Sequence, residues 1–231
     1  MTRDQLSNPT DPKRRNTKAA GAMLAALMIP AIYFSATDRS QGGDRPGVSR
    51  GEFAAKMDYC QVCHGPSAQG YRGFYPMPRL AGQQPEYLKN QLQAYVEHRR
   101  TNNIMFNVAH TLSPAMINAL AERFHDLDPR PIGGAARHLV AAGRQIFEDG
   151  VPDANVAACT ACHGPNATGR AEFPRLAGQL NTYVIKVLTN WRSERGQIIA
   201  RPDTSMIMKS VAHSLTRSQI EAVAAYVSTL R

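Results

Sequence analysis

CQVCHGPSAQG stands at residues 60–70 of the chain, and CTACHGPNATG stands at residues 159–169. In each stretch, two cysteines are separated by two residues and followed at once by a histidine, which is the attachment signature of c-type haem. Residues three and four apart on a helical turn share one face, so both thiols and the imidazole can meet one porphyrin. We therefore expect two covalently bound haem c groups, each with a proximal histidine on its iron. The attachment residues are Cys60, Cys63, Cys159 and Cys162, and the proximal ligands are His64 and His163.

Other uses of a cysteine pair fit this sequence less well. The two pairs account for all four cysteines, whereas a secreted disulfide scaffold has more cysteines at wider spacing. Zinc ribbons also contain two such pairs, but the 99-residue offset here is long for one and a histidine follows both pairs. A thioredoxin-type pair needs a strand and helix around it, and no alternating strand pattern stands out.

The surroundings of the two motifs form an internal repeat. PRLAGQ occurs at residues 78–83 and again at 174–179, and MFNVAHTL at 105–112 matches MKSVAHSL at 208–215. The proline- and glycine-rich stretch DLDPRPIGGAAR separates the copies. We therefore predict two similar domains at residues 48–127 and 138–231, joined by a linker at residues 128–137.

Each copy is expected to be helical. Apolar residues share one face of residues 85–100, and a similar run begins at Tyr183 and ends at Gly196. A terminal helix in the first copy should begin after Ser113 as N-cap, and one in the second copy after a Thr216–Gln219 capping box. Their predicted inward faces carry Ile117, Leu120, Ala121 and Phe124, and Ile220, Val223, Ala224 and Val227.

The sixth ligand of each iron should come from Met105 and Met208, which occupy matched positions in loops before the terminal helices. Met206 is a local competitor of Met208. The matched histidines His110 and His213 are alternative distal ligands, although we interpret them as histidines packed at helix entries. The unmatched histidines His98, His125 and His138 are expected at the surface.

PRLAGQ is predicted to support the haem. A metal-bound histidine usually donates its other N–H to a carbonyl, so Pro78 and Pro174 are candidate acceptors. Charged and amide side chains of the motif are candidates for binding haem propionates. These residues are Arg79, Gln83, Arg175 and Gln179.

The N-terminal segment predicts export. Residues 19–36 read AAGAMLAALMIPAIYFSA, and the basic leader at residues 1–18 places Lys13, Arg14, Arg15 and Lys18 before this run. Eighteen residues reach the lower limit for crossing a bilayer, and small-x-small cleavage residues are missing at its end. We favour a signal anchor followed by a tether at residues 37–47. A cleaved signal peptide is the alternative.

The charge adds little to this assignment. The formal net charge is +9; the first 40 residues contribute six basic and three acidic side chains, which leaves +6 for the remainder. Haem propionates would cancel much of that, and no nucleic-acid-binding motif is present, so no nucleic-acid partner is expected. A mildly basic face could help docking on an acidic redox protein.

Together, the CHGP, PRLAGQ and methionine segments resemble the cytochrome c4 family over residues 48–231. The resemblance implies an all-α chain with two tandem class I cytochrome c domains, related by approximate twofold symmetry. It implies His/Met iron: His64 with Met105, and His163 with Met208. It also implies transfer of electrons on the periplasmic side of the bacterial inner membrane toward terminal oxidases. Partners would include a quinol-cytochrome c reductase, a terminal oxidase, a small copper protein or another cytochrome.

Three functions remain distinguishable. The leading hypothesis is an electron carrier and not an enzyme, because fully ligated iron offers no open site to a substrate. A di-haem peroxidase or small-molecule dehydrogenase would need an open distal site and an acid–base cluster, and the sequence has no evident cluster of that kind. The third hypothesis is a cytochrome subunit fixed within a larger respiratory complex. It would have the same haem chemistry as the electron carrier but would stay bound to its partners.

Overall fold

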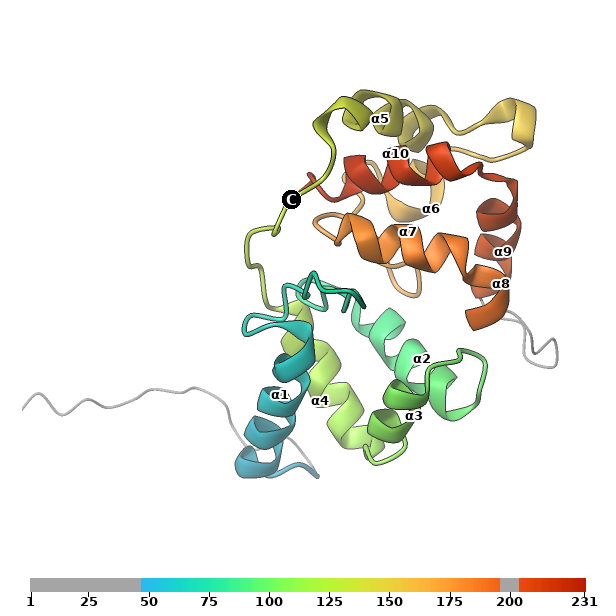
Figure 1. The fold of residues 1–231 in the computed structure, drawn as a ribbon. Coiled ribbons are helices and arrows are strands. Elements are labelled where there is room, and N and C mark those ends of the chain that lie inside the picture. Colours follow the sequence, from blue (N-terminus) through green and yellow to red (C-terminus); the bar gives the residue numbers. More distant parts are fainter. Residues whose placement is uncertain (1–46, 196–203) are drawn as a thin grey trace, which may run out of the picture. The chain divides into compact units, whose positions relative to one another are not determined.

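The computed structural model describes residues 47–195 and 204–231. The predicted leader, anchor and tether therefore lie outside the described residues, except Gly47. The described chain is helical, and its only β-type pairings are isolated bridges (Figure 1). Within these residues, no helix combines the length and apolar character needed to cross a membrane.

The first domain contains four helices. They are α1 (Arg50–His64), α2 (Pro85–Val96), α3 (Asn103–Ala109) and α4 (Pro114–His125). Ser49 and Glu52 form a capping box at the start of α1, and the predicted N-cap Ser113 accepts a hydrogen bond from the Met116 N–H. Helices α1 and α2 both pack on α4, whose Leu120 is 1% exposed in the core. Burial of an apolar face on α4 is therefore what joins these helices.

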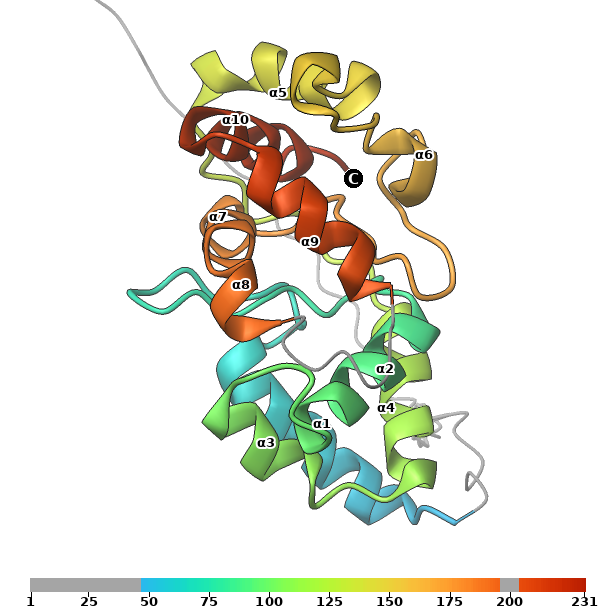
Figure 2. The same ribbon diagram turned by 90° about the vertical axis from the view of Figure 1, so that its right-hand side faces the viewer.

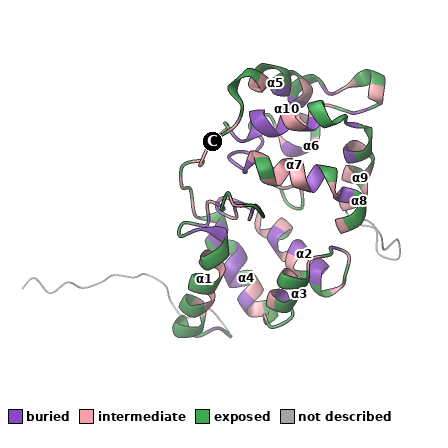
Figure 3. Ribbon diagram, in the orientation of Figure 1, coloured by how far each residue is buried: buried purple, intermediate pink, exposed green. Residues whose placement is uncertain are grey.

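The second domain repeats this plan with more breaks. Its elements are η1 (Arg137–Leu139), α5 (Val140–Asp149), η2 (Pro152–Ala154), α6 (Thr160–His163), α7 (Asn181–Thr189), α8 (Trp191–Glu194), α9 (Ser205–Ser214) and α10 (Arg217–Val227). The predicted capping box of Thr216 and Gln219 begins α10. Helix α10 packs on α5 and α7, and α9 packs on α8 (Figure 2). Buried residues occupy much of α4 and α10 (Figure 3).

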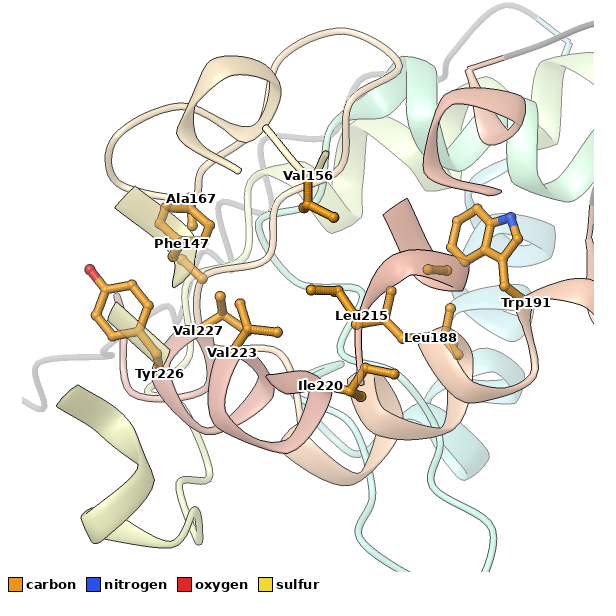
Figure 4. Close-up of a cluster of buried hydrophobic side chains, with 13 residues drawn as sticks. Phe147, Val156, Ala167, Leu188, Trp191, Leu215, Ile220, Val223, Tyr226 and Val227 are labelled. Atoms are coloured by element: carbon orange, nitrogen blue, oxygen red, sulfur yellow. The ribbon is translucent and has the colours of Figure 1, made fainter. Parts of the chain in front are cut away.

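The core of the second domain runs along α10. Its four residues predicted to face inward are all buried, and three of them, Ile220, Val223 and Val227, pack with side chains from α5, α7 and α8. Figure 4 shows Phe147 and Tyr226 at one end of this cluster and the Trp191 indole at the other. The observed inward face of α4 is rotated slightly from the predicted one. Ile117 is only half-buried, whereas Met116 and Ala119 are buried.

The helix boundaries differ from the prediction in three places. Helix α2 ends at Val96, before residue 100, and His98 takes a left-handed φ of 56° that a continuing helix does not allow. The corresponding run in the second domain breaks at Asn190, where α7 gives way to α8. Met105 and Met208 lie on the short helices α3 and α9, and the prediction that they lie in loops was wrong.

Gly143 lies where α5 packs against α10. A Cβ atom at this position would lie 1.9 Å from the Ala222 carbonyl oxygen and 2.9 Å from the Tyr226 Cβ. Because backbone has to move to relieve this clash, Gly143→Ala should lower the free energy of unfolding by about 1–3 kcal/mol or more. Thermal unfolding of the haem-loaded protein measures this loss of stability.

Gly51 is the matched control, because it lies in the first turn of α1 and a Cβ there would meet no atom within 4 Å. Gly51→Ala should leave the stability unchanged or raise it by up to about 1 kcal/mol through helix propensity. Equal melting temperatures for the two variants would contradict the close approach of α5 to α10.

Candidate functional site

Two loops of the repeat are joined by the same hydrogen bonds in both domains. The Leu80 and Ala81 N–H groups donate to the Ala68 carbonyl, at 2.9 and 3.1 Å. In the second domain, the Leu176 and Ala177 N–H groups donate to the Ala167 carbonyl at 2.8 and 2.9 Å. The loop after each CxxCH motif is thereby fixed to the PRLAGQ segment, and this places the prolyl carbonyl beside the histidine.

The two histidines are oriented alike. His64 Nδ1 lies 2.9 Å from the Pro78 carbonyl oxygen, and His163 Nδ1 lies 2.9 Å from that of Pro174. Burial lowers the pKa of both imidazoles, and the hydrogen bonds to the prolyl carbonyls only partly oppose it. A neutral ring that donates from Nδ1 leaves Nε2 as the lone-pair nitrogen, which is the arrangement an iron ligand needs.

The four thiols are unpaired, so none is committed to a disulfide. Burial raises the pKa of Cys60 and of Cys159 to about 11, whereas Cys63 is exposed. Thiols with so high a pKa are protonated near neutral pH, which does not suit a thiol–disulfide catalyst. Among the described residues, no three His, Cys, Asp or Glu side chains gather in a way that could hold a zinc ion.

A single cavity connects the predicted haem residues of both domains. Its walls include both cysteine pairs with their histidines, and they also include Met105 and Met208. The remaining lining is largely apolar, with Leu120 and Val223 contributed by the terminal helices. The residues therefore fit a porphyrin in each domain: two thiols for attachment, an imidazole and a thioether as candidate iron ligands, and apolar side chains to surround the ring.

The rival distal ligands lie elsewhere. His110 is exposed, and its Nδ1 lies 3.0 Å from the carbonyl oxygen of Phe106 in its own helix. His213 is exposed as well, and neither histidine lines the cavity. Met206 also stays off the described cavity wall, whereas Met208 is on it. The histidines predicted at the surface, His98, His125 and His138, are all exposed.

The PRLAGQ glutamines connect the two domains. The Gln179 side chain accepts from the Arg79 N–H at 2.8 Å and donates to the Arg79 carbonyl at 3.0 Å. The Gln83 side chain makes the same pair of bonds with the Arg175 backbone, at 2.6 and 3.0 Å. Both amides are buried. Each glutamine thus binds the backbone of the other domain's PRLAGQ segment, a role that the sequence-based prediction of propionate binding missed.

Loss of one such glutamine should weaken the junction measurably. Gln179→Ala leaves the N–H and C=O of buried Arg79 without partners, each a loss of about 1–3 kcal/mol. We expect the free energy of unfolding to fall by about 2–4 kcal/mol in guanidinium chloride titrations of the haem-loaded protein. The control is Gln93→Ala, because Gln93 is exposed and donates to Glu97 at the surface. Equal destabilisation by the two substitutions would contradict this role.

Sequence reasoning also missed Arg100 and Arg195, which are 8% and 4% exposed beside the cavity. Their backbones pair in an isolated antiparallel bridge between the domains. The available signal was a basic residue shortly after the helical run that follows PRLAGQ in each copy. It was obscured because these arginines are offset by 95 residues, whereas the preceding segment repeats at 96.

Comparison with known proteins agrees with this geometry. The cytochrome c family matches residues 48–128 and 140–231. Cytochrome c-552 of Acidithiobacillus ferridurans is 38% identical over 90% of this chain and 86% of its own length. The thiosulfate dehydrogenase electron acceptor of Thiomonas intermedia is 34% identical over 73% of this chain and 77% of its own. The cytochrome c4 structure from Acidithiobacillus ferrooxidans is 37% identical with a TM-score of 0.63, covering 75% of this chain and 99% of that one.

Both halves of the chain match the cytochrome c family, and the solved cytochrome c4 aligns over nearly its full length with both domains. The two domains therefore carry covalently bound haem c, and the chain transfers electrons. The chain belongs to the cytochrome c4 family of di-haem c-type cytochromes.

Proposed function

We propose that the chain carries single electrons between respiratory partners on the periplasmic side of a bacterial inner membrane. In this proposal, Cys60 and Cys63 attach one haem whose iron is ligated by His64 and Met105. Cys159 and Cys162 attach the other, ligated by His163 and Met208. The observation that carries the proposal is the placement, in both domains, of a histidine and a methionine on the walls of one cavity. Two occupied axial positions leave no site for a substrate, so outer-sphere electron transfer remains.

The ligand pair also explains why such a protein would work as a carrier. A thioether ligand favours reduced iron and raises the potential, which suits delivery of electrons to an oxidase. Each haem would be attached at two cysteines, and each proximal histidine is held by a hydrogen bond to a prolyl carbonyl. These restraints keep the geometry of the site nearly unchanged between redox states. An enzyme would require one of these methionines to leave the iron and an acid or base to act beside it.

The donor is proposed to be a quinol-oxidising complex or a soluble dehydrogenase, and the acceptor a terminal oxidase. A dehydrogenase as donor is supported by the relative named as a thiosulfate dehydrogenase electron acceptor. Rapid mixing tests the proposal: oxidised protein should be reduced by a dehydrogenase or reductase preparation and then reoxidised by oxidase-containing membranes. High-spin haem with rapid peroxide turnover would contradict the carrier role and favour a peroxidase. A stable complex with oxidase subunits after mild detergent extraction would favour a fixed subunit.

We further propose that residues 19–36 anchor the chain, with the haem domains in the periplasm. The support is the apolar run behind four basic residues. Fractionation of expressing cells, followed by N-terminal sequencing, tests the proposal. Recovery of the full N-terminus from the membrane fraction supports the anchor. A soluble periplasmic protein that begins after residue 36 would contradict it.

A further inference from the structure

The loop after the first CxxCH motif is longer than its counterpart in the second domain. Seven residues, 71–77, stand between the first CHGP segment and its PRLAGQ, whereas four residues, 170–173, stand between the second CHGP segment and its PRLAGQ. Because the flanking segments repeat, the first domain carries an insertion of three residues here. We call residues 71–77, which read YRGFYPM, the aromatic loop.

The insertion carries aromatic side chains into solvent. Phe74, in the middle of the loop, has a relative exposure of 109%, and Tyr71 and Tyr75 are 59% and 43% exposed. In the second domain, by contrast, Phe173 is half-buried and the guanidinium carbon of Arg170 lies 5.9 Å from its ring centroid. Single exposed apolar side chains are ordinary on a protein surface, but three aromatic ones within five residues mark an interaction site.

The rest of the chain holds the aromatic loop in place. Its ends pair in an antiparallel bridge, in which the N–H groups of Tyr71 and Met77 donate to each other's carbonyls at 3.1 and 3.0 Å. Arg72 Nη1 donates to the Gly133 carbonyl of the linker at 3.1 Å. The loop therefore presents Phe74 in a fixed position, so little conformational entropy has to be lost when this side chain is covered.

Tyr75 connects the aromatic loop to the haem cavity and to the second domain. Its hydroxyl accepts a hydrogen bond from Asn102 Nδ2 at 3.0 Å, and Lys186 Nζ lies 4.6 Å from its ring centroid. Tyr75 also lines the cavity that contains both CxxCH motifs, whereas Phe74 does not. The exposed phenylalanine is therefore no part of the haem site and is available to a partner outside it.

The composition of the aromatic loop fits a lipid surface. The loop contains no acidic residue, and the side chain of Arg72 is exposed next to Tyr71. Tyrosine is enriched where a bilayer meets water, because its ring is apolar and its hydroxyl is polar, and phenylalanine is typical of the apolar side of interfacial segments. A guanidinium group binds phosphate and is attracted to anionic headgroups. A protruding apolar side chain flanked by tyrosines and one cation matches the headgroup region of a phospholipid bilayer.

The chain before the first domain brings a bilayer within reach of the loop. The proposed anchor ends at residue 36, and the tether at residues 37–47 leads to Val48 at the start of the first domain. Eleven extended residues span at most about 36–40 Å. Helix α1, which leads from the tether to the first CxxCH motif, has 15 residues and is about 22 Å long. The tether therefore confines the first domain to the membrane surface, and its length permits contact between the aromatic loop and that surface.

We propose that the aromatic loop inserts Phe74 into the surface of the phospholipid bilayer that holds the anchor, with Tyr71 and Tyr75 at the level of the headgroups. The inference rests on the proposed periplasmic location and membrane anchor, and it is independent of the donor and acceptor. It assigns the membrane contact to the first domain, because the second domain lacks the insertion. Since Tyr75 lines the haem cavity, this contact holds the first haem near the bilayer, where membrane-embedded redox partners lie.

Photocrosslinking of the full-length holoprotein tests this proposal. Phe74 is replaced by p-benzoylphenylalanine, which keeps an aromatic ring, and the protein is reconstituted into vesicles of phosphatidylethanolamine and phosphatidylglycerol. Irradiation should give about tenfold or more lipid adduct at this position relative to the control, because burial of a phenylalanine ring favours the bound position by such a factor. The control carries the same photoreactive residue in place of Arg144, an exposed side chain on α5 of the second domain that pairs with Glu148.

A photoreactive lipid supplies a second readout on natural side chains. Vesicles that contain a phospholipid with a diazirine in its acyl chain should label the peptide that carries residues 71–77 of the wild-type chain. Phe74→Ser should lower this labelling by about tenfold, whereas Phe74→Trp keeps a large apolar ring and should preserve it. Because Phe74 is fully exposed, neither substitution removes a core contact, and unchanged haem spectra check that both variants are folded.

The identity of the adduct separates a lipid surface from a protein partner. No excess of lipid adduct at position 74 would overturn the proposal, whether the N-terminus is intact or cleaved. A protein adduct in place of lipid, after irradiation of intact expressing cells, would also overturn it and assign the aromatic loop to a protein partner. Excess lipid adduct on a chain that begins after residue 36, as shown by N-terminal sequencing, would support the loop contact and overturn the anchor instead.

Discussion

Met105→Ala and Met208→Ala should each remove about half of the methionine-to-iron charge-transfer absorption from the red end of the oxidised spectrum. Each methionine lines the same cavity as the attachment motif of its own domain. Loss of the thioether withdraws the ligand that favours reduced iron, so the potential of that haem should fall. We expect a drop on the order of 0.1 V or more, within the roughly 0.8 V that axial ligation spans. Absorption spectroscopy and a redox titration measure both effects.

The chain provides matched controls for this experiment. Met206→Ala changes a methionine two residues from Met208 that stays off the described cavity wall, and it should preserve the band and both potentials. His110→Ala and His213→Ala change exposed side chains and should do the same. A full-strength band in the Met105→Ala, Met208→Ala double variant would contradict the His/Met assignment. Band loss in His110→Ala would point instead to a histidine ligand.

Replacing Cys60 and Cys63 together by serine should leave a protein with one covalent haem per chain, held in the second domain. The first domain would then lack the group that its apolar cavity wall packs against, so its helices should lose stability first. The haem-to-protein ratio from a haemochrome assay should halve. Hydrogen exchange should accelerate in α1 and α4 while α10 stays protected.

The mirror variant, Cys159→Ser with Cys162→Ser, is the control for domain specificity. It should also carry one haem, but with protection retained in α1 and α4 and lost in α10. Two covalent haems in either variant would mean that attachment does not use the cysteine pair that was changed. Loss of both haems from one variant would mean that the domains do not mature independently.

Much of the fold follows from local chemistry that the sequence displays. The Ser113 and Thr216 caps begin α4 and α10 as predicted, because each side-chain oxygen accepts the N–H three residues later. The inward face of α10 was predicted from helical spacing, and each of its four residues is buried. The prolyl carbonyls beside His64 and His163 were predicted because a histidine that ligates a metal generally needs an acceptor for its other ring N–H.

The remaining features depend on contacts between distant segments. The break at Asn190 and the left-handed His98 have no local signal comparable to a cap or a proline. The glutamines of PRLAGQ bind backbone roughly a hundred residues away in sequence, across the junction, so a motif-based prediction assigned them to haem propionates instead. Arg100 and Arg195 were hidden for the same reason, because their partners are tyrosines of the opposite domain.

The most direct test of the account is the intact mass of the wild-type chain after denaturation and acid-acetone extraction. Thioether bonds at both motifs survive that treatment, so the mass should exceed that of the polypeptide by two haem groups, with the colour retained by the protein. A mass equal to the bare polypeptide, with the pigment released into the acetone, would contradict the covalent di-haem assignment.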